Sequence, residues 1–272
     1  MNAPERIEFL VDVQAQADDR LLSIDSVGIK GVRHPITIRA GERDMPTIAT
    51  FCMTVGLPAA VKGTHMSRFV ECLQAQAHAF DQRAFKAMVF DMLDRLDART
   101  GCVEMRFPYF VMKTAPVSRV QSPLDYDVCW RGEVSANGRY AFSMHVLVPA
   151  TSLCPCSKEI SAYGAHNQRS HIGIEVELAA DMTIEELVAV AERSASCDVY
   201  GLLKRPDEKF VTERAYDNPK FVEDLVRDIA IELNREIRVA RYAVDAENFE
   251  SIHNHSAFAR IAGRGGAPAS HL

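Results

Sequence analysis

The sequence predicts an α+β fold in which one β-β-α-α-β-β pattern is used twice, with antiparallel sheets and the helices on one face. Two kinds of periodicity lead to this prediction. Some stretches alternate apolar and polar residues, as half-buried strands do, and others repeat apolar residues every three or four positions, as amphipathic helices do. An Asn137-Gly138 pair between the two copies is a strong signal for a two-residue hairpin. With 272 residues, the chain is long enough for each copy to bury a core.

The first copy of the pattern is predicted over residues 21–136, after an N-terminal arm over residues 1–20. Its first two strands correspond to β-branched runs between Leu22 and Leu57. Two helices follow, whose apolar residues recur at helical spacing: Met66, Phe69, Val70, Leu73 and Ala77 in one, and Phe85, Val89, Met92 and Leu96 in the other. Alternating apolar residues predict the last two strands.

The second copy is predicted over residues 137–262, and residues 263–272 are expected to form a flexible tail. A capping box of Thr183 and Glu186 begins its first helix, and Pro219, at a first helical position, begins its second. Its strands are expected near residues 140–148, 172–178, 239–246 and 256–261.

Composition and charge restrict the classes of function. The chain has 31 Lys and Arg residues against 37 Asp and Glu, and a net charge of −6 argues against a nucleic-acid-binding protein that neutralises many phosphates. The sequence has no long uncharged apolar run that would indicate a membrane span. Its first residues lack the basic-then-apolar order of a signal peptide, so a cytoplasmic location is expected. The seven cysteines are odd in number, which disfavours a disulfide framework.

The irregular segment over residues 153–169 carries the densest chemistry. Cys154 and His166 are compatible with two metal ligands if the loop between them doubles back, and a thiolate with an imidazole suits Zn²⁺ or another borderline divalent ion. Cys156 adds a second thiol. A catalytic site needs a third ligand from a distant segment, and Glu208 is a candidate in a predicted loop between two helices. The simpler interpretation, a buried thiol pair and a solvated Glu208, stays open.

Two further segments carry groups that suit proton transfer and base recognition. His253 and His255 stand between the last two predicted strands, and imidazoles beside an activated water can act as general acid and base at neutral pH. Glu223, at the edge of the buried face of its predicted helix, can accept two hydrogen bonds from an amidine-like edge such as that of guanine. Exposed turn histidines and a solvated carboxylate are the simpler interpretations.

In the first copy, residues 62–68 open a predicted helix. Its cations, Lys62 and Arg68, lie beside a hydroxyl and the free N–H groups of a helix N-terminus, which suits a phosphate group. An ordinary helix N-terminus explains the same residues.

Together these segments resemble a known family. The run from Ser152 to Ser161, followed by Gly164 to Arg169, is similar to the signature of type IB GTP cyclohydrolase I. Residues 62–69 and 252–255 are similar to the same family, and the resemblance extends over nearly the whole chain. It implies a tunnelling fold, in which each subunit carries two tandem β-β-α-α-β-β modules, and homotetramers with active sites at subunit interfaces.

The resemblance also implies an activity. Family members convert GTP and water to 7,8-dihydroneopterin triphosphate and formate, the first step of tetrahydrofolate biosynthesis. A divalent metal (zinc, manganese or iron) would be held by Cys154, His166 and Glu208.

The resemblance assigns the remaining candidates by position. Glu223 would anchor guanine, while the reacting centre would be lined by Cys156, His253 and His255. The triphosphate would be contacted by Lys62, His65, Arg68, Lys158 and Arg169.

Other functions stay open from the sequence. A nitrile reductase of the same fold would act on a pterin-like base through a lone activated cysteine, with NADPH and no metal. An archaeal relative of the fold yields a cyclic phosphate product. A zinc-stabilised binding module without catalysis belongs to a different class, and metal chelation would unfold it.

Overall fold

The computed structural model describes residues 12–14, 16–41 and 43–266. Their elements follow one another in the order β1 (Ile24–Ala40), β2 (Arg43–Leu57), α1 (Met66–Gln74), α2 (Gln82–Arg95), β3 (Gly101–Thr114), β4 (Gln121–Val134), β5 (Tyr140–Leu153), α3 (Pro155–Ile160), β6 (Asn167–Leu178), α4 (Ile184–Ser194), β7 (Cys197–Asp198), α5 (Arg205–Asp217), α6 (Val222–Arg235), β8 (Val239–Asn248) and β9 (Ala257–Gly263). Among these helices the longest has 14 residues, and none combines the length and apolar character that a membrane span requires.

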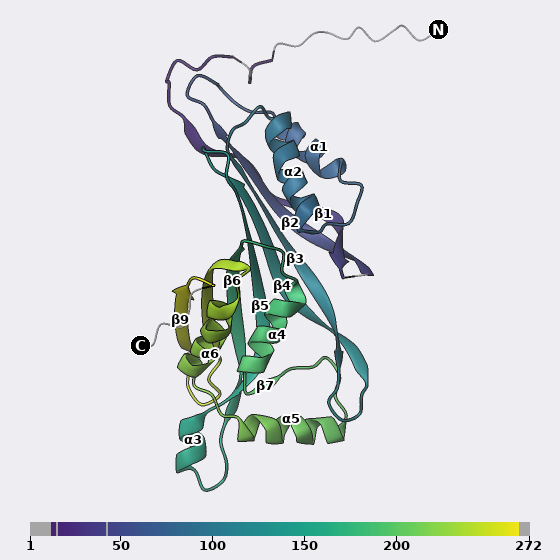
Figure 1. Cartoon of the computed structure of the whole chain (residues 1–272), viewed down its shortest axis with the longest axis vertical. Helices are drawn as coiled ribbons and strands as arrows, with labels where there is room; N and C mark the ends of the chain where they lie inside the picture. The colour runs from purple at the N-terminus through teal and green to yellow at the C-terminus, as the bar shows by residue number, and fades with distance from the viewer. Residues whose placement is uncertain (1–11, 15, 42, 267–272) are drawn as a thin grey trace, which may run out of the picture.

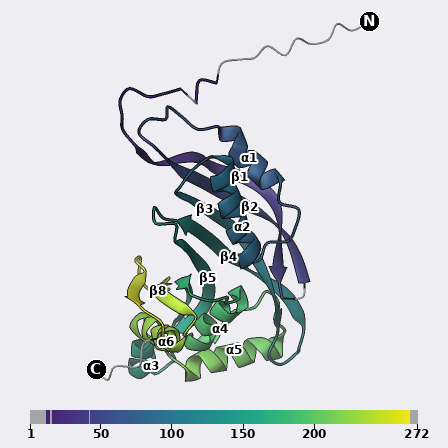
Figure 2. The same cartoon turned by 45° about the horizontal axis from the view of Figure 1, so that its top comes forward.

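All of these strands belong to one sheet in the order β1-β2-β3-β4-β5-β6-β8-β9, and the short β7 pairs with β5. Each pair of neighbours is antiparallel. The first copy has the predicted β-β-α-α-β-β order. The second copy repeats it with α3, β7 and one further helix added, since α4, α5 and α6 all lie between β6 and β8. Helices α2, α4 and α6 lie on the same face of the sheet (Figures 1 and 2).

The two copies are joined by the hairpin between β4 and β5. Gly138 has a φ of 75°, in the left-handed region that favours glycine, and its N–H donates to the Ser135 carbonyl oxygen at 2.8 Å. Strand pairing then continues from Val134–Tyr140 to Asp127–Leu147. The predicted hairpin at Asn137-Gly138 is confirmed, and it joins both copies into one continuous sheet. Its loop is wider than the predicted two residues, because the Ser135 N–H donates to the Arg139 carbonyl oxygen at 3.1 Å and leaves residues 136–138 between them.

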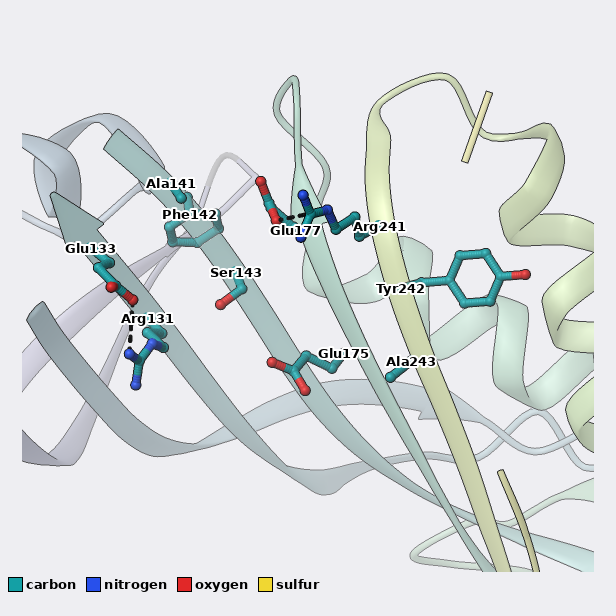
Figure 3. Close-up of a pocket in the computed structure, with 10 residues that line it drawn as sticks. All are labelled: Arg131, Glu133, Ala141, Phe142, Ser143, Glu175, Glu177, Arg241, Tyr242 and Ala243. Carbon is teal, nitrogen blue, oxygen red and sulfur yellow. Dashed lines mark hydrogen bonds and ion pairs between the residues drawn. The ribbon is translucent and has the colours of Figure 1, made fainter. Parts of the chain in front are cut away.

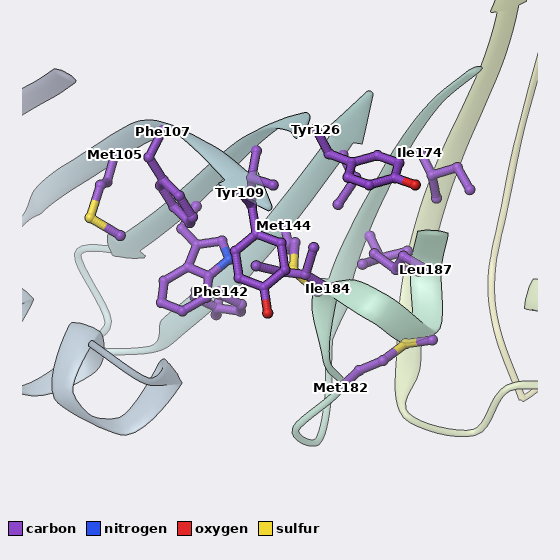
Figure 4. Close-up of a cluster of buried hydrophobic side chains, with 14 of the residues drawn as sticks. Met105, Phe107, Tyr109, Tyr126, Phe142, Met144, Ile174, Met182, Ile184 and Leu187 are labelled. Carbon is purple, nitrogen blue, oxygen red and sulfur yellow. The ribbon is translucent and has the colours of Figure 1, made fainter. Parts of the chain in front are cut away.

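Period-two alternation assigns one face of this sheet to the helices. One buried row, paired across β4, β5, β6 and β8, consists of Trp130, Met144, Val176 and Tyr242. The next row, on the opposite face, consists of Arg131, Ser143, Glu177 and Arg241. Side chains of both copies meet in the buried cluster of Figure 4, where Tyr109 and Tyr126 of the first copy lie near Ile184 and Leu187 of α4. The two units therefore share a core.

The structure corrects the prediction of a loop around Glu208, because this residue lies in the first turn of α5. Pro206 occupies an early helical position, and the Asp207 carboxylate accepts the Lys204 N–H at 2.8 Å. Only Asp207 and Ala215 are buried in this helix, so its sequence has too little apolar periodicity to reveal it.

Two other boundaries also differ from the prediction. Helix α6 begins at Val222 instead of Pro219, because the Lys220 N–H donates to the Leu153 carbonyl oxygen at 3.1 Å and the chain is still a loop there. The short helix α3 lies in the segment that the sequence left irregular.

The predicted arm and tail are described only in part. Residues 1–11, 15 and 267–272 lie outside the described residues. Described parts of the arm lie along residues 60–63, where the Lys62 N–H donates to the Gln16 carbonyl oxygen at 3.1 Å. Strand β9 runs through Gly263, the first residue of the predicted tail.

A buried ion cluster between the sheet and α4 ties the two copies together. Lys113 Nζ of β3 lies 2.7 Å from Glu192 Oε1 of α4 and 3.0 Å from Asp198 Oδ2 of β7. The three side chains are 11%, 14% and 15% exposed, and the Tyr126 hydroxyl donates to Glu192 at 2.8 Å. Burial opposes ionisation of Asp198, but Lys113 nevertheless lowers the pKa of this carboxyl below its usual value.

We predict that Lys113→Met destabilises the protein by about 3–5 kcal/mol at pH 7, because two buried carboxylates lose their cation. In the parent, the stabilisation from Asp198 is complete above the ordinary carboxyl pKa and is lost only as pH falls through its lowered folded value. In the variant the unpaired carboxyls gain protons as pH falls, so the difference in unfolding free energy between variant and parent should shrink toward pH 5. Urea unfolding of parent and variant at fixed protein concentration, at pH 7 and at pH 5, measures these unfolding free energies.

Lys209→Met is the matched control. Lys209 is 75% exposed and lies 3.8 Å from Glu213, so its loss should change stability by less than about 1 kcal/mol. Equal effects of the two substitutions would contradict a stabilising role for the buried cluster.

Candidate functional site

The densest chemistry begins where β5 ends. Cys154 is the N-cap of α3, and its Sγ accepts the Ser157 N–H at 3.5 Å. Pro155 follows at a position where a helix needs no N–H donor, so the local sequence favours a helix start here. Cys154 is half-buried, whereas Cys156, in the first turn, is exposed. The thiol of Cys154 is thus held at a fixed helix terminus.

His166 returns to the same point after the loop. The Cys154 N–H donates to the His166 carbonyl oxygen at 3.2 Å. The Ser157 hydroxyl donates to the Cys154 carbonyl oxygen at 3.1 Å and accepts the His166 N–H at 3.3 Å. The doubled-back loop on which the sequence prediction depended is therefore present, and Ser157 links its two ends.

The imidazole of His166 contacts the segment after β8. Its Nδ1 lies 3.2 Å from Ser251 Oγ and 3.9 Å from Glu250 Oε2. The His166 and Glu250 side chains are 13% and 14% exposed. Partners of this kind orient a histidine that binds metal through its other nitrogen. Sequence reasoning missed Glu250 and Ser251, and the only signal was their position just before His253.

His253 and His255 lie in the same connection between β8 and β9. Both are exposed, and their rings stack with centroids 5.0 Å apart and an interplanar angle of 13°. The structure brings this pair to the same segment as the His166 partners Glu250 and Ser251, where both imidazoles are accessible to a ligand.

The start of α6 lies beside the β5–α3 junction, because Lys220 is hydrogen-bonded to Leu153. Glu223 follows in the first turn of α6 and is exposed at the edge of the buried face, as the sequence predicts. The reason is that the apolar stripe of α6, which includes Val222 and Leu225, faces the sheet and leaves Glu223 outside. The carboxylate is free of the core and accessible to a ligand.

Two predicted triphosphate contacts also lie in this region. Arg169 is exposed at the start of β6. Lys158 Nζ donates to the Tyr216 carbonyl oxygen at 2.6 Å and lies 4.4 Å from the centre of the Tyr216 ring, so it ties α3 to the end of α5. Lys158 is thus already engaged in a contact within the chain.

Glu208 is not gathered with Cys154 and His166. It lies in the first turn of α5, whereas Tyr216, which contacts α3, lies about 12 Å further along the helix. Within the described residues, no three His, Cys, Asp or Glu side chains are placed to hold a metal ion. The Cys154 thiol and the His166 imidazole suit a divalent ion by their chemistry, and their backbones are hydrogen-bonded to each other. The Glu208 carboxylate suits the ion by its chemistry alone.

The residues of the first copy lie still further away. Helix α1, which starts at Met66, and α3 are at opposite ends of the molecule in both views (Figures 1 and 2). Lys62 Nζ contacts Gln16 Oε1 at 3.3 Å, His65 Nε2 lies 3.2 Å from Asp12 Oδ2, and an Arg68 nitrogen donates to the Arg95 carbonyl oxygen at 3.0 Å. One chain therefore presents two separate groups of candidates.

A pocket of about 300 Å³ opens elsewhere, on the sheet face that the helices leave uncovered. Figure 3 shows its charged lining, in which Arg131 lies 2.8 Å from Glu133 and Arg241 lies 3.8 Å from Glu177. None of the predicted site residues lines this pocket. Both of its arginines pair with carboxylates of the lining, Arg131 with Glu133 and Arg241 with Glu177.

Comparison with known proteins identifies the family. A family model described as type I GTP cyclohydrolase folE2 matches residues 10–259. The chain belongs to this family. GTP cyclohydrolase FolE2 1 of Dechloromonas aromatica (strain RCB) is 60% identical over 265 residues, which cover 97% of this chain and 99% of the relative. GTP cyclohydrolase FolE2 of Azoarcus sp. (strain BH72) is 56% identical over 262 residues, covering 96% and 97%. The resemblance to GTP cyclohydrolase I seen in the sequence is confirmed.

Solved structures support the fold of this family member. Uricase from Arthrobacter globiformis superimposes with a TM-score of 0.54 over 91% of this chain and 96% of the uricase, at 7% sequence identity. At such low identity the likeness shows the fold alone, and it confirms the predicted tunnelling fold.

We predict that Ser157→Ala lowers the affinity for a divalent metal about 10- to 100-fold, because Ser157 links the backbones that carry Cys154 and His166. Titration with Mn²⁺, followed by electron paramagnetic resonance, measures the affinity. Ser161→Ala is the control, since the Ser161 hydroxyl accepts the Tyr163 N–H at 3.2 Å in the same loop. Equal affinities of both variants would contradict the linking role.

Proposed function

We propose that this chain converts GTP and water to 7,8-dihydroneopterin triphosphate and formate, the first step of tetrahydrofolate biosynthesis, as a type IB GTP cyclohydrolase I. GTP cyclohydrolase activity in folate biosynthesis follows from family membership. The observation that carries the proposal is the identity of 60% over 97% of the chain with a GTP cyclohydrolase FolE2. The accessible groups around Cys154 and His166 are of the types that the reaction needs.

We infer that Cys154, His166 and Glu208 bind a divalent ion, zinc, manganese or iron. Support comes from the loop that brings Cys154 to His166 and from the contacts of His166 Nδ1, which leave Nε2 to face a ligand. Such an ion, when bound, supplies Lewis-acid activation of water for attack at C8 of guanine. Thiolate, imidazole and carboxylate suit several ions, and availability would select among them.

The side chains around this centre would handle protons and orient the base. Glu223 would accept the guanine N1–H and N2–H₂ donors, which turns C8 toward Cys154 and lowers the barrier through positioning. His253 and His255 would protonate a ring nitrogen and move protons during formate release and the sugar rearrangement. Cys156, which is exposed and lies two residues before Lys158, would line the reacting centre.

We propose that the active site is completed in a homotetramer, at the interfaces between subunits. Two facts support this: Glu208 lies away from Cys154, and the group of Lys62, His65 and Arg68 lies at the other end of the chain. A neighbouring copy would bring these residues to the triphosphate, together with Lys158 and Arg169 of the first chain. The edge strands β1 and β9 offer backbone groups for pairing between copies.

GTP is the small-molecule partner in this proposal, and nucleic acid and membrane are not. The net charge of −6 allows a few local cations for one triphosphate but not a broad phosphate-binding surface. All seven cysteines are free, as is typical of a reducing compartment, which supports a cytoplasmic location.

Formate release from GTP, without NADPH, tests the function. The parent loaded with Mn²⁺ or Zn²⁺ should release one formate for each dihydroneopterin triphosphate formed, and Cys154→Ala should lose bound metal and at least about a thousandfold in turnover, because a ligand is missing. Formate is quantified enzymatically, products by chromatography and metal by elemental analysis. Full turnover by the variant would contradict the assignment of Cys154.

Chelation separates the proposed enzyme from its alternatives. An enzyme should lose turnover in EDTA while its melting temperature changes little, since the shared core is built from apolar side chains and includes none of the proposed metal ligands. A zinc-stabilised module would unfold instead. NADPH consumption would indicate a nitrile reductase, and a cyclic phosphate product would indicate the archaeal type of reaction.

We predict that Glu223→Gln raises the KM for GTP about tenfold or more, with a smaller effect on kcat, because one charge-assisted hydrogen bond to guanine is weakened. Steady-state kinetics measure the split. Glu232→Gln, at the other end of α6 and paired with Arg193 on the surface, is the control and should leave KM unchanged. An unaltered KM in Glu223→Gln would contradict base anchoring.

A further inference from the structure

Asp207, which the sequence does not single out, is the anchor of α5. Its side chain is fully buried and accepts four hydrogen bonds. Oδ1 accepts the N–H groups of Val117 and Ser118, both at 2.8 Å. Oδ2 accepts the Ser118 hydroxyl at 2.5 Å and the Lys204 N–H at 2.8 Å. One carboxylate thus joins the start of α5 to the loop between β3 and β4.

Both carboxylate oxygens of Asp207 therefore act as acceptors, each for two hydrogen bonds. A neutral amide of the same shape has one acceptor oxygen and cannot satisfy both sets of donors.

Two other contacts hold the segment before α5 against the same hairpin. Asp198 Oδ2 lies 3.0 Å from Lys113 Nζ, near the end of β3. Gly201 approaches the start of β4 so closely that a Cβ there would lie 2.7 Å from the Pro123 carbonyl oxygen. Together with Asp207, these contacts place the segment from Asp198 to Glu208 on a hairpin of the first copy.

Glu208 follows Asp207 directly but points the other way. Its side chain is exposed, and among the described residues its carboxylate has no hydrogen bond or ion pair. The location of this carboxylate is consequently set by the backbone of the first turn of α5, and that turn is held by Asp207.

We propose that Asp207 is a positioning residue for the metal centre: it fixes the first turn of α5 on the β3–β4 hairpin and thereby fixes the exposed location from which Glu208 would serve as a ligand. This inference rests on the proposed function, in particular on Glu208 as a ligand. It makes the first copy of the fold responsible for placing a ligand that belongs to the second copy.

The test measures Mn²⁺ affinity of the full-length protein by electron paramagnetic resonance, which needs no turnover. Asp207→Asn keeps the side-chain volume but loses an acceptor, and we expect at least about a tenfold loss of affinity. Glu208→Gln should lose affinity as well. In the Glu208→Gln background, Asp207→Asn should have no further effect, because Asp207 acts through Glu208.

A purely structural role gives a different pattern. Asp207→Asn would then lower affinity by the same factor with or without Glu208, and this outcome would overturn the proposal. Glu213→Gln, a carboxylate 63% exposed on the same helix, is the control and should bind Mn²⁺ like the parent. Should Asp207→Asn not fold, Ser118→Ala is the alternative, because it removes one donor only. It should lower Mn²⁺ affinity several-fold in the protein that has Glu208 and should have no effect in the Glu208→Gln variant.

Failure of the proposed function is distinguishable from failure of this inference. Parent-like affinity in Glu208→Gln would show that Glu208 is no ligand. This outcome would overturn both the proposed metal site and the positioning role of Asp207. Lost affinity in Glu208→Gln with parent-like affinity in Asp207→Asn would keep the ligand assignment and overturn the positioning role alone.

Discussion

Strands β4 and β5 pair from Val134–Tyr140 to Asp127–Leu147, and the rest of the structure depends on this contact. Successive side chains of a strand point to opposite faces, so the register of this one pair decides which rows of the two copies face the helices. A slip by one residue would turn Met144 away from Trp130 and place Ser143 in the core. The shared core and the buried ion pairs of Lys113 both require the observed register.

The same sheet order assembles the candidate site. Because β5, β6 and β8 are antiparallel neighbours, the end of β5, the start of β6 and the end of β8 meet at the same end of the sheet. Glu250 is far in sequence from Cys154 and His166, yet all three lie within a few residues of that end of the sheet. Short loops with their own hydrogen bonds, through Ser157 and Ser251, then set the contacts among them.

The fold and the site were predictable to different extents. Strands and amphipathic helices were readable because burial on one side imposes a period on the sequence. Helix α5 escaped because a buried carboxylate holds it and its apolar face is small. Glu250 escaped because an acid beside a turn looks like any solvated residue until His166 is placed next to it. Glu223 was correctly assigned to the edge of the buried face of α6, because helical spacing fixes its direction relative to the apolar stripe.

The sequence by itself determined the repeated α+β pattern, the hairpin that joins its copies and the cysteine–histidine loop, since each depends on residues close together in the chain. Only the tertiary structure decided that the two sheets are one, that His166 is oriented by Glu250 and Ser251, and that Asp207 holds α5 on the first copy. These contacts join residues far apart in sequence. Strand order and helix docking, which local periodicity does not encode, bring them together.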